Sequence, residues 1–355
     1  MTVQVRLATI KDEPLWNNYV DNHSRATPYH RFGWLKSVEQ AYQHKNMAAI
    51  ALQDNQIVGV LPCIQMQRPL LRPAFCALPY CDVGYALGDD SAIVGLLTQF
   101  INQQLSAANG QKFEFRDLVD GPTEDSQMEG QKVRMLLALP ETSEELLSGF
   151  KSKLRSQIRK SEKNGLRYEI FKNGQGLDDF YHIFAINMRK LGSPVHSKEW
   201  FKHLLTNYQG NCVLSVVYSE DIPIGAGITL SNNQNTAIPW ASTVAEYNKL
   251  APNMLLYWSL LKEACDNNMR SFDFGRSTFG EGTYRFKAQW GAVPQLLNWY
   301  NAASQTSQNF TVQDNDERES APKGRLRPLV ESIWAKLPLG VTTSVGPKIR
   351  KHISL

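Results

Sequence analysis

The chain has 355 residues, of which 42% are hydrophobic, and its formal net charge is +4. This length supplies enough apolar material for a buried core and is typical of about two domains, while the small net charge does not indicate a dedicated nucleic-acid-binding protein. The five cysteines are scattered and form no C-x-x-C pair, so we expect reduced thiols rather than a zinc or disulfide framework.

The chain carries no pattern typical of membrane insertion or export. Its first residues, MTVQVRLATIKDEPLW, contain no apolar run of the kind found in a secretory signal. Nowhere do about 18 apolar residues follow one another, as a membrane-spanning helix requires. We therefore predict a cytoplasmic protein.

Two long stretches of the chain follow the same order of predicted elements. Each has a strand, a polar turn and a second strand, then an apolar helical segment and a short alternating strand. These elements fall at residues 48–65, 91–110 and 113–115, and again at 213–230, 252–268 and 272–274. A repeat of about 160 residues is the size of one domain, so we predict a duplicated layered α/β or α+β unit, with domains at 1–150 and 151–300.

Residues 151–165, at the predicted junction, are typical of a basic helix that ends at Asn164 and Gly165. Glu162 is the only acidic residue among its many lysines and arginines. Clustered basic residues attract phosphates, which makes Arg155 and Arg159 candidates for contact with tRNA or a phosphorylated substrate. The alternative is a solvated helix face.

Three segments of the second half offer candidate binding residues. The segment NMRKLGSPVH contains Arg189 and His196; histidine titrates near neutrality and suits acid–base work, although a capping or packing role is the alternative. Trp240, in the predicted strand AIPWAS, forms either a cleft wall or part of the core. Tyr247 and Asn253 flank the start of an apolar helix, where free backbone N–H groups favour a phosphate unless the helix is an ordinary capped core helix.

The segment SFDFGRSTFGEGTYRFKAQWGA predicts a strand followed by a glycine-containing loop. Strand alternation puts Phe272 and Phe274 on one face and Asp273 on the other. Loops at the carboxyl end of a strand are where α/β proteins tend to bind ligands. The polar residues that cluster in this loop are Arg276, Tyr284, Arg285 and Lys287.

The last part of the chain changes character twice. Residues 301–322 are polar and acidic without periodicity, which is typical of a flexible linker. Residues 323–355 are basic, and Leu326, Leu329, Val330, Ile333, Trp334 and Leu337 form an apolar stripe on one predicted helix. This tail either lies on an anionic membrane surface or packs on the protein's own surface or on a second subunit.

Three segments, NMRKLGSPVH, IPWASTVAEYNKLAPNMLLYWSLL and FDFGRSTFGEGTYRFKAQWGA, closely resemble the FemAB-related proteins found with bacterial exopolysaccharide and PEP-CTERM sorting systems. The resemblance spans nearly the whole chain and is weakest between Leu70 and Val133. It implies an α/β (α+β) fold of two tandem GNAT-like domains, each a mixed, mostly antiparallel sheet flanked by helices. It also implies transfer of an acyl or aminoacyl group to an amine; better-known relatives use aminoacyl-tRNA as donor and a lipid-linked or nucleotide-linked muropeptide as acceptor.

On this resemblance we expect an acyltransferase that acts on a cell-envelope or exopolysaccharide precursor. The donor is expected to be acyl-CoA, acyl carrier protein or aminoacyl-tRNA, and the acceptor a phosphate-bearing or lipid-linked saccharide. We expect neither a tightly bound cofactor nor a metal. The turn before Pro252 lacks the Arg/Gln-x-x-Gly-x-Gly/Ala pattern usual in GNAT domains, which argues against ordinary acetyl-CoA binding. The alternative function is a non-catalytic adaptor that binds lipid-linked saccharides at the inner face of the membrane.

Acyl transfer to an amine sets the roles expected of the candidate residues. A base must accept the ammonium proton, and a cation or donor must stabilise the developing oxyanion. Asp273 is the candidate base, and Arg276 and Lys287 are the candidate cations. The resemblance places the stretch Phe286–Gly291 in the active cleft, which makes Lys287 the strongest candidate. The alternative for Asp273 is a structural salt bridge with Arg276.

Overall fold

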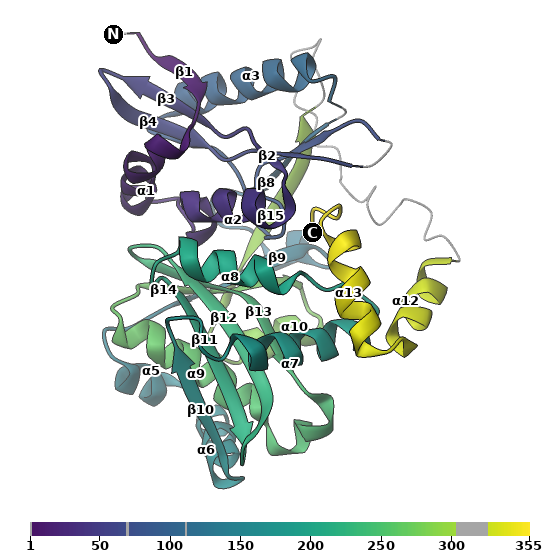
Figure 1. The fold of residues 1–355 in the computed structure, drawn as a ribbon. Coiled ribbons are helices and arrows are strands. Elements are labelled where there is room, and N and C mark those ends of the chain that lie inside the picture. Colours follow the sequence, from purple (N-terminus) through teal and green to yellow (C-terminus); the bar gives the residue numbers. More distant parts are fainter. Residues whose placement is uncertain (1, 69–70, 111, 303–325) are drawn as a thin grey trace. The chain divides into compact units, whose positions relative to one another are not determined.

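The computed structural model describes residues 2–68, 71–110, 112–302 and 326–355, which form two compact units (Figure 1). Unit 1 consists of Met1–Pro122, Leu297–Lys323 and His352–Leu355. Unit 2 consists of Thr123–Leu296 and Gly324–Lys351. The domain limits at residues 150 and 300 stay a prediction, because these units are defined by contacts in space rather than by continuous segments of sequence.

Unit 1 contains two groups of paired strands. In the first, β1 (Gln4–Leu7), β3 (Ala49–Gln53), β4 (Gln56–Leu61) and β7 (Leu87–Gly88) lie side by side in that order. In the second, β8 (Phe113–Leu118) pairs with residues 297–302 of β15 (Val293–Ala302) and with β6 (Ala74–Cys76), followed by β5 (Ile64–Met66) and β2 (Lys45–Asn46). The helices are α1 (Glu13–Asn22), α2 (Phe32–Tyr42) and α3 (Ser91–Ala107).

The core of unit 1 follows from the spacing of apolar residues on α3. Ile93, Leu97, Ile101 and Leu105 recur every fourth residue, and all are buried. The helix lies close against β4, because a Cβ added to Gly59 would meet the Ile93 Cγ2 at 2.5 Å. Glycine is therefore required at this point of the hairpin by the approach of the helix.

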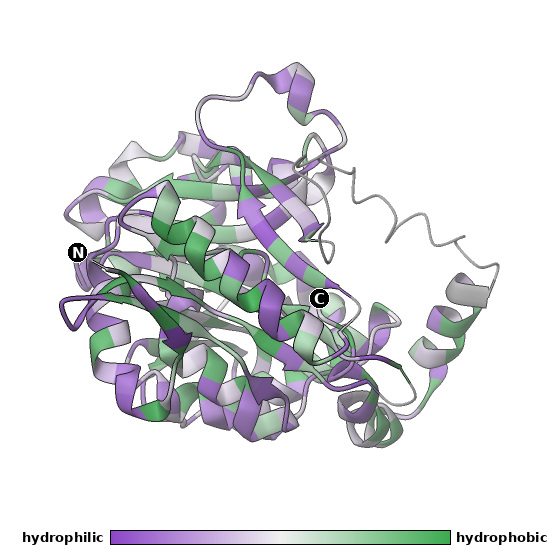
Figure 2. Cartoon of the chain, turned by 90° about the horizontal axis from the view of Figure 1, so that it is seen from above, coloured by the Kyte–Doolittle hydropathy of each residue, from purple (hydrophilic) through white to green (hydrophobic). Residues whose placement is uncertain are grey.

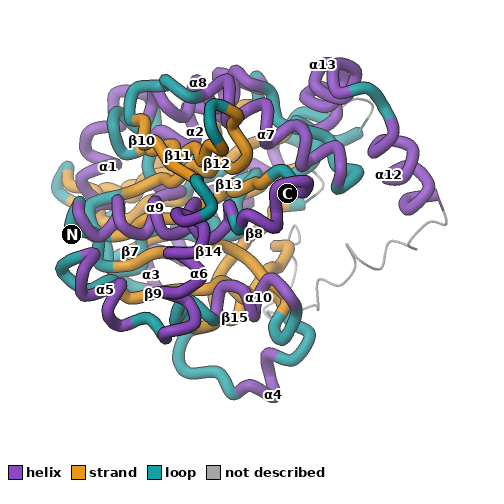
Figure 3. The backbone as a smooth tube through the Cα atoms, turned by 90° about the horizontal axis from the view of Figure 1, so that it is seen from below, coloured by secondary structure: helices purple, strands orange, loops and turns teal. Residues whose placement is uncertain are grey.

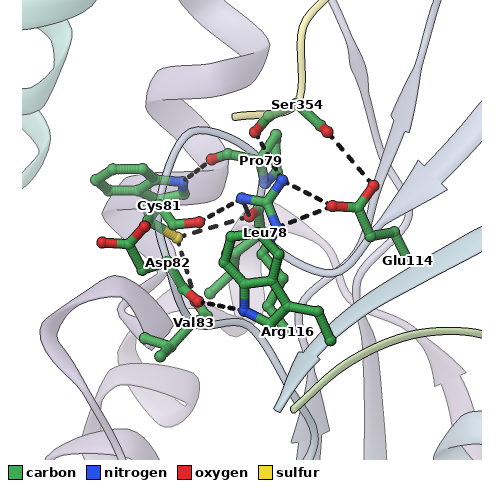
Figure 4. A network of polar contacts seen from close by, with 10 residues as sticks. Leu78, Pro79, Cys81, Asp82, Val83, Glu114, Arg116 and Ser354 are labelled. Atoms are coloured by element: carbon green, nitrogen blue, oxygen red, sulfur yellow. Dashed lines mark hydrogen bonds and ion pairs between the residues drawn. The ribbon is translucent and has the colours of Figure 1, made fainter. Parts of the chain in front are cut away.

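Unit 1 also holds a buried polar network that includes residues from the far end of the chain (Figure 4). Arg116 on β8 is fully buried and donates to the Glu114 carboxylate at 2.8 Å. The Ser354 carbonyl accepts from Arg116 Nη2 at 2.9 Å and from the Tyr80 N–H at 2.6 Å. A buried charge is tolerated only when it is paired and hydrogen-bonded. The Ser354 carbonyl supplies one of the hydrogen bonds that buried Arg116 needs.

Unit 2 is built on one mixed, mostly antiparallel sheet. Its order is β10 (Leu166–Phe171), β11 (Cys212–Ser219), β12 (Ile222–Ser231), β13 (Asn235–Thr243), β14 (Ser271–Thr278), β9 (Lys132–Ala138) and residues 293–296 of β15. Only the β13–β14 pair is parallel. The helices within Thr123–Leu296 are α4 (Asp125–Met128), α5 (Ser143–Gly149), α6 (Ser152–Lys163), α7 (Leu177–Lys190), α8 (Lys198–Asn207), α9 (Pro252–Asp266) and α10 (Gly282–Ala288), with a 3-10 helix, η3 (Ala245–Leu250).

The predicted mixed, mostly antiparallel fold and its repeated order of elements are confirmed. The hairpin β3–β4, helix α3 and strand β8 of unit 1 correspond to β11–β12, α9 and β14 of unit 2. In each unit the strand after the helix is parallel to an earlier one, β8 to β6 and β14 to β13. The predicted end of α6 is also confirmed, with Asn164 as C-cap and Gly165 at φ 78°.

The parallel pair of unit 2 is joined only at its start. Asn235–Ala237 pairs with Ser271–Asp273, whereas β13 continues to Thr243 beside β12 and β14 continues to Thr278 beside β9. The carboxyl-terminal half of each strand therefore has no partner in the other. This local separation positions the cavity described below.

The tail forms two helices that pack against α7 of unit 2 (Figure 3). The predicted helix is confirmed as α12 (Leu326–Lys336), and a second helix, α13 (Leu339–Arg350), was not predicted. Most of the predicted linker, residues 303–322, lies outside the described residues, and Asn301 and Ala302 end β15. None of the helices in the described ranges combines the length and apolar character needed to cross a membrane. All five cysteines are described, are buried and form no disulfide.

Candidate functional site

A cavity of about 300 Å³ opens in unit 2 where β13 and β14 are no longer paired. It is lined by the end of β13, the first turns of α9, helix α10 and one residue of α7. The lining residues are Asn187, Ala241, Ser242, Thr243, Asn253, Tyr257, Gly282, Thr283, Phe286 and Lys287. Two of the candidate residues from the sequence, Asn253 and Lys287, are thus brought to one place.

The residues just before helix α9 explain why it begins at this cavity. Ala251 adopts a left-handed conformation with φ 62°, and Pro252 occupies the first helical position, where its missing N–H costs no hydrogen bond. Asn253 and Tyr257 are one turn apart, so both reach the cavity from the same side of the helix. The positive end of the helix dipole therefore lies at the cavity, where it favours an anion.

Lys287 is held by the backbone of β14. Its Nζ donates to the carbonyls of Gly275 and Arg276, at 3.0 and 2.8 Å, and its side chain is 8% exposed. These carbonyls belong to an irregularity in β14, where the register with β9 shifts between Asp273 and Arg276 and Gly275 has φ 73°. The expectation that these residues form a loop is wrong, because β14 runs through Gly275 in a bulge and Lys287 belongs to α10.

The buried side chain of Asp273 helps to hold the same bulge in β14. It is 7% exposed, its Oδ1 accepts from the Gly275 N–H at 2.8 Å, and its Oδ2 lies 3.7 Å from Nη1 of Arg134 on β9. It is not among the residues that line the cavity. The carboxylate therefore fixes the bulge that supplies the two carbonyls to Lys287.

Residues that sequence reasoning missed complete the lining. Asn187 of α7 donates from Nδ2 to the Ser242 Oγ at 3.1 Å, which links α7 to the end of β13. Burial raises the pKa of Tyr257 to about 12, so its phenol stays protonated near neutral pH. Asn187 is the first residue of the segment NMRKLGSPVH, and no local pattern in the sequence distinguishes it as a site residue.

His196 lies outside the cavity lining, in an aromatic cluster of unit 2. It is 1% exposed and stacks on Trp200 with ring centroids 5.7 Å apart. Burial, with the nearby charge of Arg350, lowers its pKa well below the ordinary value, so the ring stays neutral. Trp240 packs against His196 and Phe201 in this cluster, at 6.0 and 5.1 Å, and is also absent from the lining.

The other candidate residues are spread over unit 2. Arg189, Tyr247 and Tyr284 are half-buried, and Tyr284 packs against Phe279 at 4.7 Å. Arg276 is half-buried on β14, where its carbonyl accepts from Lys287. None of these side chains lines the cavity.

The basic helix α6 ends beside the turn that leads into α9. Asn164 donates from Nδ2 to the Leu250 carbonyl at 3.2 Å, and Leu250 is two residues before Pro252. Arg159 is exposed, whereas Arg155 donates to the Ser148 carbonyl at 2.7 Å and so helps to hold the start of the helix. The carboxyl end of the basic helix α6 therefore adjoins the N-terminus of α9, which favours an anion.

Unit 2 has a second, larger cavity of about 730 Å³ at the other end of α7. Its walls carry Asp178, Asp179, Lys198 and Lys202, and Lys198 forms an ion pair with Asp178. Its lining includes no candidate residue from the sequence. We therefore assign the candidate site to the smaller cavity, whose lining combines a buried cation, a helix N-terminus and amide and hydroxyl groups.

Comparisons with known proteins concern the domain and the fold. Residues 148–288 match the family model described as an acetyltransferase (GNAT) domain. The crystal structure of FemX superposes with a TM-score of 0.66 at 13% identity, covering 84% of this chain and 97% of that one. A tandem GNAT protein from the clavulanic acid biosynthesis pathway gives 0.52 at 10% identity, covering 86% and 100%.

L-PGS from Bacillus licheniformis is similar in fold as well, with a TM-score of 0.54 at 9% identity over 86% of this chain and 96% of that one. No protein with curated annotation matches the sequence. At such low identities the solved structures show the fold alone. Residues 148–288 of this chain thus carry a GNAT acetyltransferase domain, within a fold similar to those of FemX and of tandem GNAT proteins.

Proposed function

We propose that the chain transfers an acyl or aminoacyl group to an amine of a cell-envelope or exopolysaccharide precursor, and that the reaction takes place in the smaller cavity of unit 2. One observation carries the proposal: the cavity lies where the parallel strands β13 and β14 part, between the N-terminus of α9 and the buried Lys287. Such a place offers backbone N–H groups and a cation to a ligand that carries negative charge.

The donor enters with its phosphates toward the start of α9. The acetyltransferase domain match favours acyl-CoA, whose pyrophosphate suits the dipole of α9. Ala251, at φ 62°, takes the left-handed turn into the helix that glycine usually provides, so the missing glycine pattern leaves the turn geometry intact. Acyl carrier protein and aminoacyl-tRNA remain alternative donors of the same chemistry.

In the transfer step the amine nitrogen attacks the acyl carbonyl carbon and the C–N bond forms. The C–S bond of a thioester, or the C–O bond of an ester, then breaks, and the leaving sulfur or oxygen takes up a proton. Negative charge develops on the carbonyl oxygen, and the Lys287 ammonium and the Asn187–Ser242 pair lie in the lining where they stabilise it. Because two carbonyls hold Lys287 in place, little reorganisation is needed during the reaction.

The proton of the attacking amine passes to water rather than to a side chain in contact with it. The lining residues include neither a carboxylate nor an imidazole. Asp273 supports Lys287 through the bulge, and His196 is buried elsewhere in unit 2. In this mechanism Asp273 is a positioning residue, and the amine reacts in its neutral form.

The acceptor is a phosphate-bearing or lipid-linked saccharide, and the protein works at the inner face of the membrane. The exposed basic residues of α6, Arg159 among them, supply positive charge near the turn into α9. They attract the phosphates of the acceptor or of a donor such as tRNA. Arg189, Tyr247 and Tyr284 belong to the same unit and are proposed as more distant substrate contacts.

The experiment is to supply the full chain with labelled acyl-CoA, acylated carrier protein and aminoacyl-tRNA in turn, with an amino sugar or an amino-acid amide as acceptor. Amide formation from one donor class, detected by mass spectrometry, is the expected result. Binding of saccharide phosphates without turnover from any donor would instead identify a non-catalytic adaptor.

A further inference from the structure

Apolar side chains stay exposed on both helices of the tail, where Figure 2 shows hydrophobic residues along each helix. On α12 and α13 together they form what we call the tail face. Its apolar members, between 41% and 58% exposed, are Leu329, Val330, Ile333, Val341, Val345 and Ile349. Single exposed apolar residues are ordinary on a protein surface, but three on one side of each of two successive helices mark a site of interaction.

Packing within unit 2 fixes which side of the tail is turned outward. A Cβ added to Gly192, after α7, would meet the Glu331 Cβ of α12 at 2.7 Å. A Cβ added to Gly346 of α13 would meet the Val195 N at 2.9 Å, and Thr342, one turn earlier, is buried. Both helices are therefore seated closely on the segment after α7, and the tail face is on their exposed sides.

The charged residues of the tail also differ between its exposed side and its packed side. Lys336 and Lys348 are exposed and follow Ile333 and Val345 by three residues, so each lysine borders the apolar residues on its own helix. Glu331, an acidic residue of α12, is half-buried against Gly192 on the other side. The tail face is thus apolar with a positive border.

We propose that the tail face docks on an anionic lipid surface. The helices have 11 and 12 residues, too few to span a bilayer but enough to lie in its interface with the apolar residues inserted. Lysines at such a border keep their ammonium groups among lipid phosphates while their stems stay in contact with the acyl region. The proposal does not depend on the transfer chemistry, because the cavity and the tail face share no residue.

The test is co-sedimentation of the full chain with vesicles of phosphatidylcholine alone or mixed with phosphatidylglycerol. We expect binding to the anionic vesicles and several-fold weaker binding to the neutral ones. The double variant Ile333→Ser/Val345→Ser should lose most of the binding. Its control is Ile222→Ser, which removes an isoleucine that is 51% exposed elsewhere in unit 2.

A second pair of variants separates charge from apolar contact. Lys336→Gln/Lys348→Gln should weaken binding to anionic vesicles about fivefold or more per lysine, whereas Lys11→Gln/Lys45→Gln, with the same loss of charge in unit 1, should not. Equal sedimentation of the wild type and the Ile333→Ser/Val345→Ser variant would overturn the proposal. So would a dimer in lipid-free solution that the same variant converts to a monomer, because the tail face would then be covered by a second copy. Neither result bears on acyl transfer, which is measured separately with water-soluble substrates.

Discussion

Lys287 combines features that a purely structural lysine rarely shows. Its ammonium is buried, is held by two backbone carbonyls and lines a cavity at the start of a helix. Burying an ammonium is costly unless its hydrogen bonds are made, so the bulge in β14 is needed to keep the cation in place. The glycine at 275 and the carboxylate at 273 act together to build that bulge.

Replacing Lys287 with Met should lower the transfer rate by about a hundredfold or more, since the cation that stabilises the oxyanion is removed. It should also lower the free energy of unfolding by about 1–3 kcal/mol, because the carbonyls of Gly275 and Arg276 lose their donor. Steady-state rates should be read at a temperature where circular dichroism shows the variant folded. Lys11→Met, at an exposed lysine of unit 1, is the control, and unchanged activity in Lys287→Met would contradict the assignment.

The pH dependence of transfer distinguishes water from Asp273 as proton acceptor. If the amine reacts in its neutral form, the rate should rise with pH up to the pKa of the acceptor amine, about 8 for an α-amino group. Asp273→Asn retains an oxygen for the Gly275 N–H and should leave the shape of the pH profile unchanged. Loss of a limb of the profile in this variant would show that Asp273 is the base.

The burial of His196 leads to a prediction about stability rather than catalysis. Its folded-state pKa lies well below its unfolded value, so the unfolded chain binds a proton that the folded chain does not. Below about pH 6.5 this group should lower the free energy of unfolding by up to about 1.4 kcal/mol per pH unit. Urea titrations from pH 7 to 5 should show a shallower decline in His196→Gln, and parallel curves for the two proteins would contradict the buried, neutral assignment.

At the scale of elements, regular patterns were predictable and irregular ones were not. Alternation identified the hairpins, and Asn164 with Gly165 identified the end of α6. The glycines after Phe274 are compatible with a loop or with a bulge, because glycine adopts a positive φ in both. The sequence alone therefore did not distinguish the bulge in β14 from the predicted loop. Helix α13 was missed since its sequence LGVTTSVGPKIR contains glycines, β-branched residues and Pro347, and it is held instead by contact of Gly346 with Val195.

The candidate site was predictable only in part for a related reason. Asn253 and Lys287 stand in segments whose local pattern marks them, but the pairing of Asn187 with Ser242 joins two elements that are far apart in the sequence. No local pattern reports such a contact. The catalytic roles assigned to Asp273 and His196 from residue type stay predictions, and both side chains are buried outside the cavity lining.

Helix α6 supports a prediction about phosphate binding. Arg159→Glu should weaken binding of a phosphorylated donor or acceptor, and the difference from wild type should shrink as salt rises. Arg155→Glu also breaks the bond to the Ser148 carbonyl, so its effect would mix binding with the stability of the helix start. Titration calorimetry at two salt concentrations measures the affinity for the phosphorylated ligand, with Lys45→Glu as control. Equal affinities for wild type and Arg159→Glu at low salt would show that α6 is only a solvated helix.

On the scale of the whole molecule, each compact unit draws on distant parts of the chain. Strand β15 gives its first residues to unit 2 and its last to unit 1, and residues 352–355 return to unit 1. The boundaries of such units cannot be read from local composition, because a strand or a short segment can complete a sheet or a polar network far from its neighbours in sequence.

Deletion of residues 352–355 should destabilise unit 1, because Arg116 and the Tyr80 N–H lose the Ser354 carbonyl inside a buried network. The expected loss is about 1–3 kcal/mol of the free energy of unfolding, measured by urea denaturation. Leu355→Ala keeps the Ser354 peptide carbonyl and is the control. Identical denaturation curves for the shortened and full chains would show that the network does not depend on Ser354.

The measurement that most directly tests the central claim compares two threonine variants in the donor-labelled transfer reaction. Thr283 and Thr206 are both exposed, and each lines one of the two cavities described above for unit 2. Tryptophan at position 283 fills the smaller cavity, so Thr283→Trp should abolish amide formation, whereas Thr206→Trp should retain the wild-type rate. Full transfer by Thr283→Trp, or loss of transfer only in Thr206→Trp, would contradict the placement of the reaction between the parted strands and α9.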